Sequence, residues 1–221
     1  MTVILVLVTF SIFILLDWVT NRRKAPQVAA TGQKASALPE PSYVEGFLVP
    51  EHLSYHPGHS WAMQERRNLV RVGVDEFAAA LVGNVERIEL PKPGHWLRQG
   101  QKSWSFFRDG EKTEMVSPTE GEVVEINPEV VAHPELLRKD PYGLGWLALI
   151  HVPDEESTAR NLVPEGMVRS WMREAVGRLY ARQPQLAGAV AADGGLPTED
   201  LLAGLPHVDW RQVTGEFFLT A

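Results

Sequence analysis

Three histidines lie close together and are the first residues in this sequence whose types and spacing suggest chemistry. His52, His56 and His59 follow one another closely, and the spacing of the last two is one that metal ligands use. Pro57 and Gly58 stand between them, and proline prevents a helix from presenting both imidazoles on one face. The chain contains no Cys, which excludes thiolate zinc ligands, disulfides and a cysteine nucleophile. We therefore expect no metal site.

No other pattern of a catalytic centre is present. The sequence has no G-x-S-x-G elbow, no H-E-x-x-H pair and no glycine-rich phosphate loop. Its formal net charge of −7 argues against a general nucleic-acid-binding protein, which is usually basic. We expect no catalytic residue, predict that the chain is not an enzyme, and expect no nucleic acid among its partners. An enzymatic site within the C-terminal residues is the least favoured alternative.

A lysine beside a tight turn is the other candidate for chemistry. Residues 103–124 predict two strands joined by a turn, then a second turn and a third strand. Asp109-Gly110 is typical of a two-residue type I′ hairpin turn, because glycine accepts the positive φ that this turn requires. Lys112 lies just beyond that turn, on the returning strand.

The elements around this hairpin are short. Residues 68–74 alternate as in a strand, and residues 84–90 predict another. Between them, Asp75 is a suitable N-cap and Gly83 a suitable end for a short helix. Many short strands separated by turn signals favour a β-sandwich or barrel.

Several separated motifs resemble the H protein of the glycine cleavage system. They are H-x-W at 59–61, E-L-P at 89–91, S-P-x-x-G-E-V-V at 117–124 and D-P-Y-G-x-G-W-L at 140–147. The resemblance implies a mainly β fold, a lipoyl/biotinyl-type β-sandwich of the hybrid-motif kind with short helices. It also implies a swinging-arm carrier, with lipoic acid attached to a lysine at the hairpin tip. In the family, that lysine lies seven residues before the serine of the S-P pair, which is Ser117 here. Here that position is Gly110.

The missing lysine leaves two main hypotheses. The first is a non-lipoylated H-protein-like domain without a cofactor, acting as a binding or structural subunit of a complex. The alternative is a genuine carrier lipoylated on Lys112, which shuttles an aminomethyl group or electrons. On a strand, a shift of two residues keeps the same face but moves the amine by roughly 6–7 Å. Phe106 and Phe107, just before the turn, are candidates for contact with a protein partner.

The N-terminal residues predict a membrane anchor. Residues 2–19 are almost uninterrupted apolar residues, near the lower length limit for a transmembrane helix. Arg22, Arg23 and Lys24 follow, so the positive-inside rule places the remainder in the cytoplasm. We expect a single-pass protein of the inner (cytoplasmic) membrane. The alternative is a signal peptide cleaved near residues 29–30.

The resulting domain prediction is an anchor at 1–20, a flexible linker at 21–46, an H-protein-like domain at 47–153 and a helical C-terminal extension at 154–221. Proline and small polar residues dominate the linker. In the extension, residues 165–183 predict an amphipathic helix that includes Trp171, and a second helix includes Trp210. The apolar faces of these helices either pack on the chain's own domain or dock a partner, so both tryptophans are candidate contacts.

Overall fold

The computed structural model describes residues 42–153, 159–184, 186, 200–203, 205 and 208–221. The predicted anchor at residues 2–19 and nearly all of the predicted linker lie outside this described part. Within it, no helix is both long enough and apolar enough to cross a membrane. The anchor therefore stays a prediction from the sequence.

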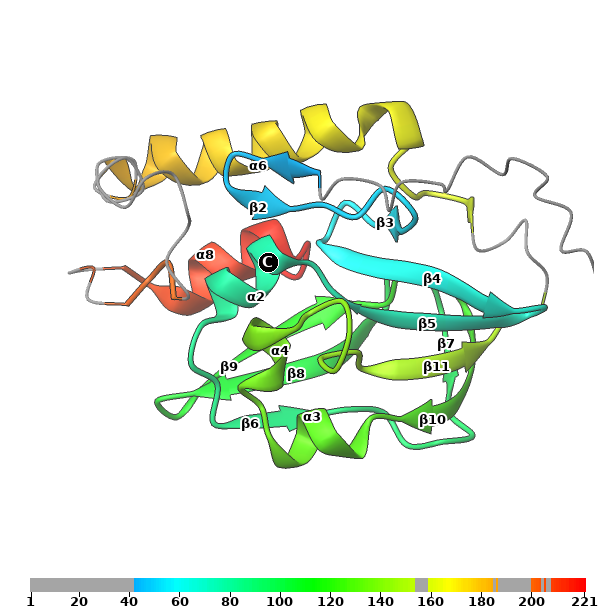
Figure 1. The fold of residues 1–221 in the computed structure, drawn as a ribbon. Helices are drawn as coiled ribbons and strands as arrows, with labels where there is room; N and C mark the ends of the chain where they lie inside the picture. Colours follow the sequence, from blue (N-terminus) through cyan, green and yellow to red (C-terminus); the bar gives the residue numbers. More distant parts are fainter. Residues whose placement is uncertain (1–41, 154–158, 185, 187–199, 204, 206–207) are drawn as a thin grey trace, which may run out of the picture. The chain divides into compact units, whose positions relative to one another are not determined.

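Six antiparallel strands form the larger sheet, in the order β3-β4-β5-β11-β10-β7 (Figure 1). Along β5, Val70, Val72 and Val74 are buried while Leu69 and Arg71 are partly exposed, so alternate side chains enter the core as the sequence predicted. The strands are β3 (Ser54–Tyr55), β4 (Ser60–Arg66), β5 (Leu69–Val74), β7 (Trp96–Leu97), β10 (Gly121–Ile126) and β11 (Ala148–His151).

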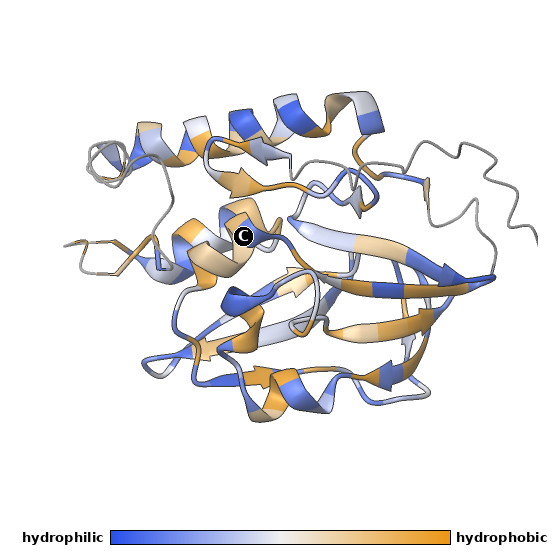
Figure 2. Cartoon of the chain, in the orientation of Figure 1, coloured by the Kyte–Doolittle hydropathy of each residue, from blue (hydrophilic) through white to orange (hydrophobic). Residues whose placement is uncertain are grey.

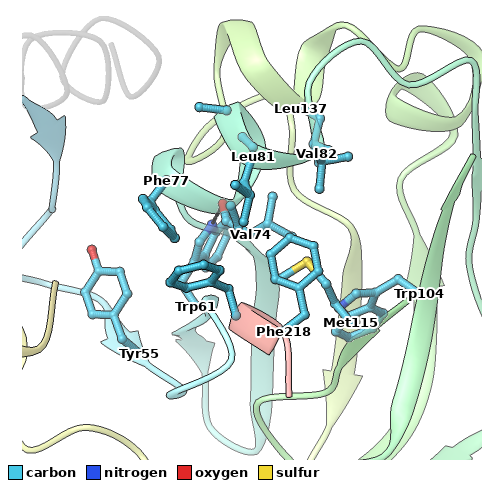
Figure 3. Close-up of a cluster of buried hydrophobic side chains, with 14 of the residues drawn as sticks. Tyr55, Trp61, Val74, Phe77, Leu81, Val82, Trp104, Met115, Leu137 and Phe218 are labelled. Atoms are coloured by element: carbon cyan, nitrogen blue, oxygen red, sulfur yellow. Dashed lines mark hydrogen bonds between the residues drawn. The ribbon is translucent and has the colours of Figure 1, made fainter. Parts of the chain in front are cut away.

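Three antiparallel strands, β6 (Arg87–Glu89), β8 (Lys102–Arg108) and β9 (Glu111–Val116), form a second sheet in the order β6-β8-β9. Their inward side chains, among them Trp104 and Met115, join the core of the larger sheet (Figure 3). The predicted hairpin is therefore confirmed, and a mainly β fold with short helices agrees with the expected sandwich or barrel.

Short helices fill the connections between strands. Helix α2 (Glu76–Val82) begins at Asp75, whose carboxylate accepts a hydrogen bond from the Ala78 amide at 2.7 Å. It ends at Gly83, whose φ of 72° suits glycine. Both ends agree with the sequence prediction. Helices α3 (Pro128–Ala132) and α4 (Leu136–Lys139) follow β10.

The turn at residues 140–145 connects several of these elements. The Asp140 carboxylate accepts hydrogen bonds from the amides of Gly143 (3.0 Å) and Leu144 (2.7 Å), which closes the turn on itself. The Tyr142 hydroxyl donates to the Leu48 carbonyl at 2.6 Å, and it accepts from the amide at the start of α2. The motif at 140–147 thus fixes the position of α2 through hydrogen bonds.

The predicted linker extends too far toward the domain. Strands β1 (Tyr43–Val44) and β2 (Phe47–Leu48) form a small hairpin whose Glu45-Gly46 turn has positive φ at both residues. Val44 and Phe47 are buried at 3% and 0% exposure, so this hairpin packs on the hydrophobic core. Local composition had suggested a linker because prolines precede this pair of strands.

The C-terminal extension is part of the same folded unit, which spans residues 41–221. Its described helical elements are η1 (Glu165–Met167), α6 (Val168–Arg182) and α8 (Trp210–Phe217). Helix α6 lies beside β1, and α8 lies against β9 and α2 (Figure 1). Phe218, just after α8, belongs to the buried cluster that contains Trp61 and Met115 (Figure 3). The extension therefore completes the hydrophobic core.

Helix α6 is two-faced, as its alternating hydrophilic and hydrophobic bands in Figure 2 illustrate. Its apolar side is buried in the core, which favours packing on the chain's own domain over docking of a partner. Four arginines on the flanks of this helix contact neighbouring segments. The pairs are Arg169 with Ser42, Arg173 with Glu45, Arg178 with the ring of Phe217, and Arg182 with Glu216.

Candidate functional site at the hairpin tip

The tip of the β8–β9 hairpin is the position to which the sequence resemblance assigns chemistry. Asp109 and Gly110 have φ of 50° and 77°, as a type I′ turn requires, and Arg108 pairs with Glu111 on either side. A Cβ added at Gly110 would meet no atom within 4 Å. The Asp109 side chain is 82% exposed. The tip is therefore open to solvent, and the residue at its second turn position carries no side chain.

Lys112 is not at this tip. It lies within β9, directly across from Phe107 on β8. Its Nζ donates a hydrogen bond to Glu114 Oε1 at 2.8 Å, and its side chain is 45% exposed. An exposed ion pair of this kind contributes little free energy. It does direct the amine along the strand, away from the turn.

The two phenylalanines before the tip have different environments. Phe106 is fully buried, with 0% exposure, so it is a core residue. Phe107 is partly buried, and the Arg87 guanidinium lies 3.6 Å from the centre of its ring. The alternation of a strand explains the difference, since consecutive side chains point to opposite faces. Burial removes Phe106 from the candidate contact surface, while Phe107 stays a candidate.

The tryptophans of the extension lie against the domain. Trp210 is 6% exposed, and its Nε1 donates to the Val82 carbonyl at 3.2 Å. Trp171 is partly exposed and stacks on His59, with ring centroids 4.6 Å apart. Burial removes Trp210 from the candidate contact surface. Trp171 presents only part of its ring to solvent.

The extension also holds the flanks of the hairpin. Arg108 Nη1 lies 3.1 Å from the Asp200 carboxylate, and the two side chains are only 18% and 7% exposed. Asp200 also accepts from the Asn84 amide at 3.2 Å, just beyond α2. Under the hairpin, the hydroxyls of Thr113 and Thr214 are hydrogen-bonded at 2.7 Å and buried. The extension therefore fixes the hairpin beside its turn, at Arg108, and along its underside, at Thr113, while Gly110 itself faces open space.

Sequence reasoning missed these contacts of Asp200 and Thr214. Asp200 and Arg108 are 92 residues apart in the sequence, and Thr214 and Thr113 are 101 residues apart. Neither residue belongs to a local motif, so the sequence carried no signal for the pairing.

The histidines form no metal centre. No group of three or more His, Cys, Asp or Glu side chains in the described part of the chain is arranged to hold a metal ion. Instead, His59 Nδ1 lies 2.7 Å from Asp75 Oδ2, with both side chains fully buried. His56 Nδ1 accepts from the Gly58 amide at 3.0 Å. Burial, together with the nearby charge of His59, lowers the pKa of His56 from 6.5 to about 4.

Comparison with known proteins identifies the fold family. A model of the glycine cleavage H-protein family matches residues 53–175, more than half of the chain. The chain belongs to the glycine cleavage H-protein family. The glycine cleavage system H protein of Mycobacterium leprae is 36% identical over 106 residues, which cover 48% of this chain and 80% of that protein. The one from Aeromonas salmonicida is 34% identical over 118 residues, covering 53% and 92%.

A solved H-protein structure from Mycobacterium marinum is 26% identical, covers 48% of this chain and 87% of that chain, and gives a TM-score of 0.44. The family match ends at residue 175, inside α6, so most of the extension lies beyond it. The predicted resemblance is thus confirmed for the β domain. The family also implies a lipoyl group, and the residues at the tip do not fit one, because the second turn position is a glycine without an amine.

Proposed function

We propose that this protein is a membrane-anchored H-protein-like domain that is not lipoylated and acts as a binding or structural subunit of a complex at the cytoplasmic face. The observation that carries the proposal is the hairpin tip. Gly110 occupies the position at which the family resemblance expects the lipoyl lysine, and its φ of 77° belongs to a tight turn. Without an amine at this position, the chain has no attachment point for a swinging arm.

Two further features support a binding role over a carrier role. The nearest lysine, Lys112, is displaced along β9 and paired with Glu114. A ligase that recognises a lysine at the tip would meet a different geometry there. The extension holds the hairpin beside its turn through the Arg108–Asp200 ion pair, so the tip is a rigid protrusion whose Gly110 faces open space. A rigid protrusion suits contact with a protein partner, because little conformational entropy is lost on binding.

Lipoylation is tested by co-expressing the chain with a lipoyl ligase and lipoate, followed by intact-mass measurement and peptide mapping. The wild type is expected to stay unmodified. Gly110→Lys places an amine at the tip, where a Cβ meets no neighbouring atom and the cost is the backbone strain of a positive φ. An adduct on that variant alone would show that the scaffold is recognised and only the attachment point is missing.

The carrier alternative gives a distinct result in the same experiment. A stoichiometric lipoyl adduct on wild-type Lys112 that disappears in Lys112→Arg would refute the non-lipoylated proposal. The 45% exposure of the Lys112 side chain leaves it accessible enough for the measurement to be decisive. If neither the wild type nor Gly110→Lys is modified, the tip has also lost ligase recognition, and the binding role stands.

Membrane attachment is a separate part of the proposal, supported by the apolar residues 2–19 and the basic residues that follow them. Wild-type protein is expected in the membrane fraction, and a chain lacking residues 1–24 in the soluble fraction. Protease added outside spheroplasts is expected to leave the β domain intact. Degradation of the domain from that side would reverse the proposed orientation.

A further inference from the structure

The turn at residues 56–59 lies where the β domain meets the extension. The His59 amide donates to the His56 carbonyl at 2.9 Å, which closes the turn. Both histidines are buried, at 7% and 0% exposure. A Cβ added at Gly58 would come within 3.0 Å of Val116 Cγ2 and 3.2 Å of the Phe218 carbonyl oxygen. The turn is therefore packed closely between the end of β9 and the residue that follows α8.

His56 holds this turn through its unprotonated nitrogen. Its Nδ1 accepts a hydrogen bond from the Gly58 amide at 3.0 Å, so this nitrogen carries no proton. A proton on Nδ1 would replace the acceptor with a donor and set two N–H groups against each other. Val116 and Phe218 lie close to Gly58, so movement of this turn would disturb them. Protonation of His56 therefore disfavours the observed packing.

His59 connects the turn to the extension through ring contacts. Its ring lies between Phe77 of α2 and Trp171 of α6, with centroids 4.6 Å from each, and Phe217 of α8 lies 6.3 Å away. Its Nδ1 is hydrogen-bonded to Asp75, while its Nε2 is buried and has no hydrogen-bond partner in the part of the chain that the structure describes. Any displacement of the turn therefore disturbs the contact with both extension helices.

The titratable groups in contact with the turn belong to the β domain. Asp75, the N-cap of α2, is hydrogen-bonded to His59, and Tyr55 of β3 directly precedes His56. The extension faces the turn with the aromatic rings of Trp171 and Phe217. Of its arginines, Arg178 lies over the Phe217 ring, and Arg173 and Arg182 are paired with Glu45 and Glu216.

We propose that residues 56–59 are a proton-sensitive latch for the C-terminal extension: with His56 neutral the turn holds Trp171 and Phe218 in place, and protonation of His56 weakens the docking of α6 and α8. This inference is independent of the lipoylation state. The direction of the pH effect follows from the linkage between protonation of His56 and docking of the extension. The pKa of His56 is lowered to about 4 when the extension is docked and is near 6.5 when the turn is released, so docking loses free energy as the pH falls between these values.

Hydrogen exchange of the full chain, read by mass spectrometry, tests the latch at pH 7.5 and pH 5 after correction for intrinsic rates. Peptides from α6 and α8 are compared with peptides from β5, which serve as the internal reference. If opening of the extension releases His56 fully, the two pKa values make that opening up to about 30-fold more favourable by pH 5. Protection of β5 should not change by this factor.

His56→Asn is the decisive variant, because an Asn side-chain oxygen accepts the amide two residues on but does not titrate. It should abolish the pH dependence in α6 and α8, whereas His52→Asn, at an exposed position, should retain it. The latch is wrong if the wild type shows no selective change, if His56→Asn keeps it, or if all elements lose protection together. Should His56→Asn not fold, NMR titration of the wild-type imidazole decides: a His56 pKa near 6.5 with the extension docked would also refute the proposal.

Discussion

The hairpin tip and the C-terminal extension contrast in how they relate to the rest of the molecule. The tip carries the position to which the family resemblance assigns chemistry, yet a side chain added at Gly110 would contact nothing within 4 Å. The extension lies mostly beyond the family match, yet Phe217 and Phe218 are among the largest fully buried side chains. The extension, whose apolar faces could have packed inward or docked a partner, thus stabilises the fold, and the position to which the resemblance assigns chemistry is a turn residue without a side chain.

This contrast separates two kinds of sequence change. A side chain at an open tip changes with little effect on packing, because no neighbour contacts it. Packing additional helices on a core makes the stability of the domain depend on them, because apolar surface of the domain is then buried against these helices.

Phe217→Ala should lower the free energy of unfolding by about 3–5 kcal/mol, the usual cost of emptying a buried phenylalanine site. The Phe217 ring is 1% exposed and meets Phe77 edge-on at 5.3 Å. Denaturant unfolding gives the measurement. Leu219→Ala is the matched control, because Leu219 is 55% exposed and its truncation should have little effect. A loss for Phe217→Ala as small as that of the control would show that the extension is not part of the core.

Asp200→Ala should cost about 2 kcal/mol, because it leaves the poorly exposed Arg108 and the Asn84 amide without their carboxylate acceptor. Thermal or denaturant unfolding measures the change. Asp109→Asn is the control, since Asp109 is 82% exposed, its contact with Arg108 is 3.4 Å, and Asn-Gly also suits a type I′ turn. Equal effects of the two substitutions would contradict the proposed role of Asp200 in holding the hairpin beside its turn.

Gly110→Ala should destabilise the chain by about 1 kcal/mol, purely through its positive φ, because the added methyl group meets no neighbour. Gly177→Ala is the opposite case. Gly177 lies within α6, and an added Cβ there also meets nothing within 4 Å. That substitution should stabilise by about 0.5–1 kcal/mol. If both substitutions changed unfolding in the same direction, the assigned backbone conformation of the tip would be wrong.

Glu76→Gln should give a small stabilisation at neutral pH. Burial raises the pKa of Glu76, with the neighbouring Asp75 acting in the same direction, while the hydrogen bond from the Leu48 amide opposes them. A raised pKa means that the ionised carboxylate is disfavoured in the folded state, so its cost appears above the ordinary pKa and vanishes in acid. The melting-temperature difference between variant and wild type should therefore shrink from pH 7 to pH 4. Glu111→Gln, at an exposed hairpin position, should change little at either pH.

Much of the β domain could be predicted from local patterns of residues. Local chemistry fixed the Asp109-Gly110 turn and the two ends of α2, because glycine conformational freedom and N-cap hydrogen bonds depend on adjacent residues only. The separated family motifs then predicted the fold and showed that the tip lacks its lysine. Local composition failed at β1 and the turn after it, where burial of Val44 and pairing with β2 override the linker-like residues that precede them.

Only the tertiary structure decided what the aromatic residues and the extension do. Helical spacing showed that α6 has an apolar face, but a partner and the chain's own core bury such a face equally well. The stacking of Trp171 on His59 and the contact of Asp200 with Arg108 join residues more than ninety positions apart. Such pairings depend on how the whole chain packs, and no local pattern of residues encodes them.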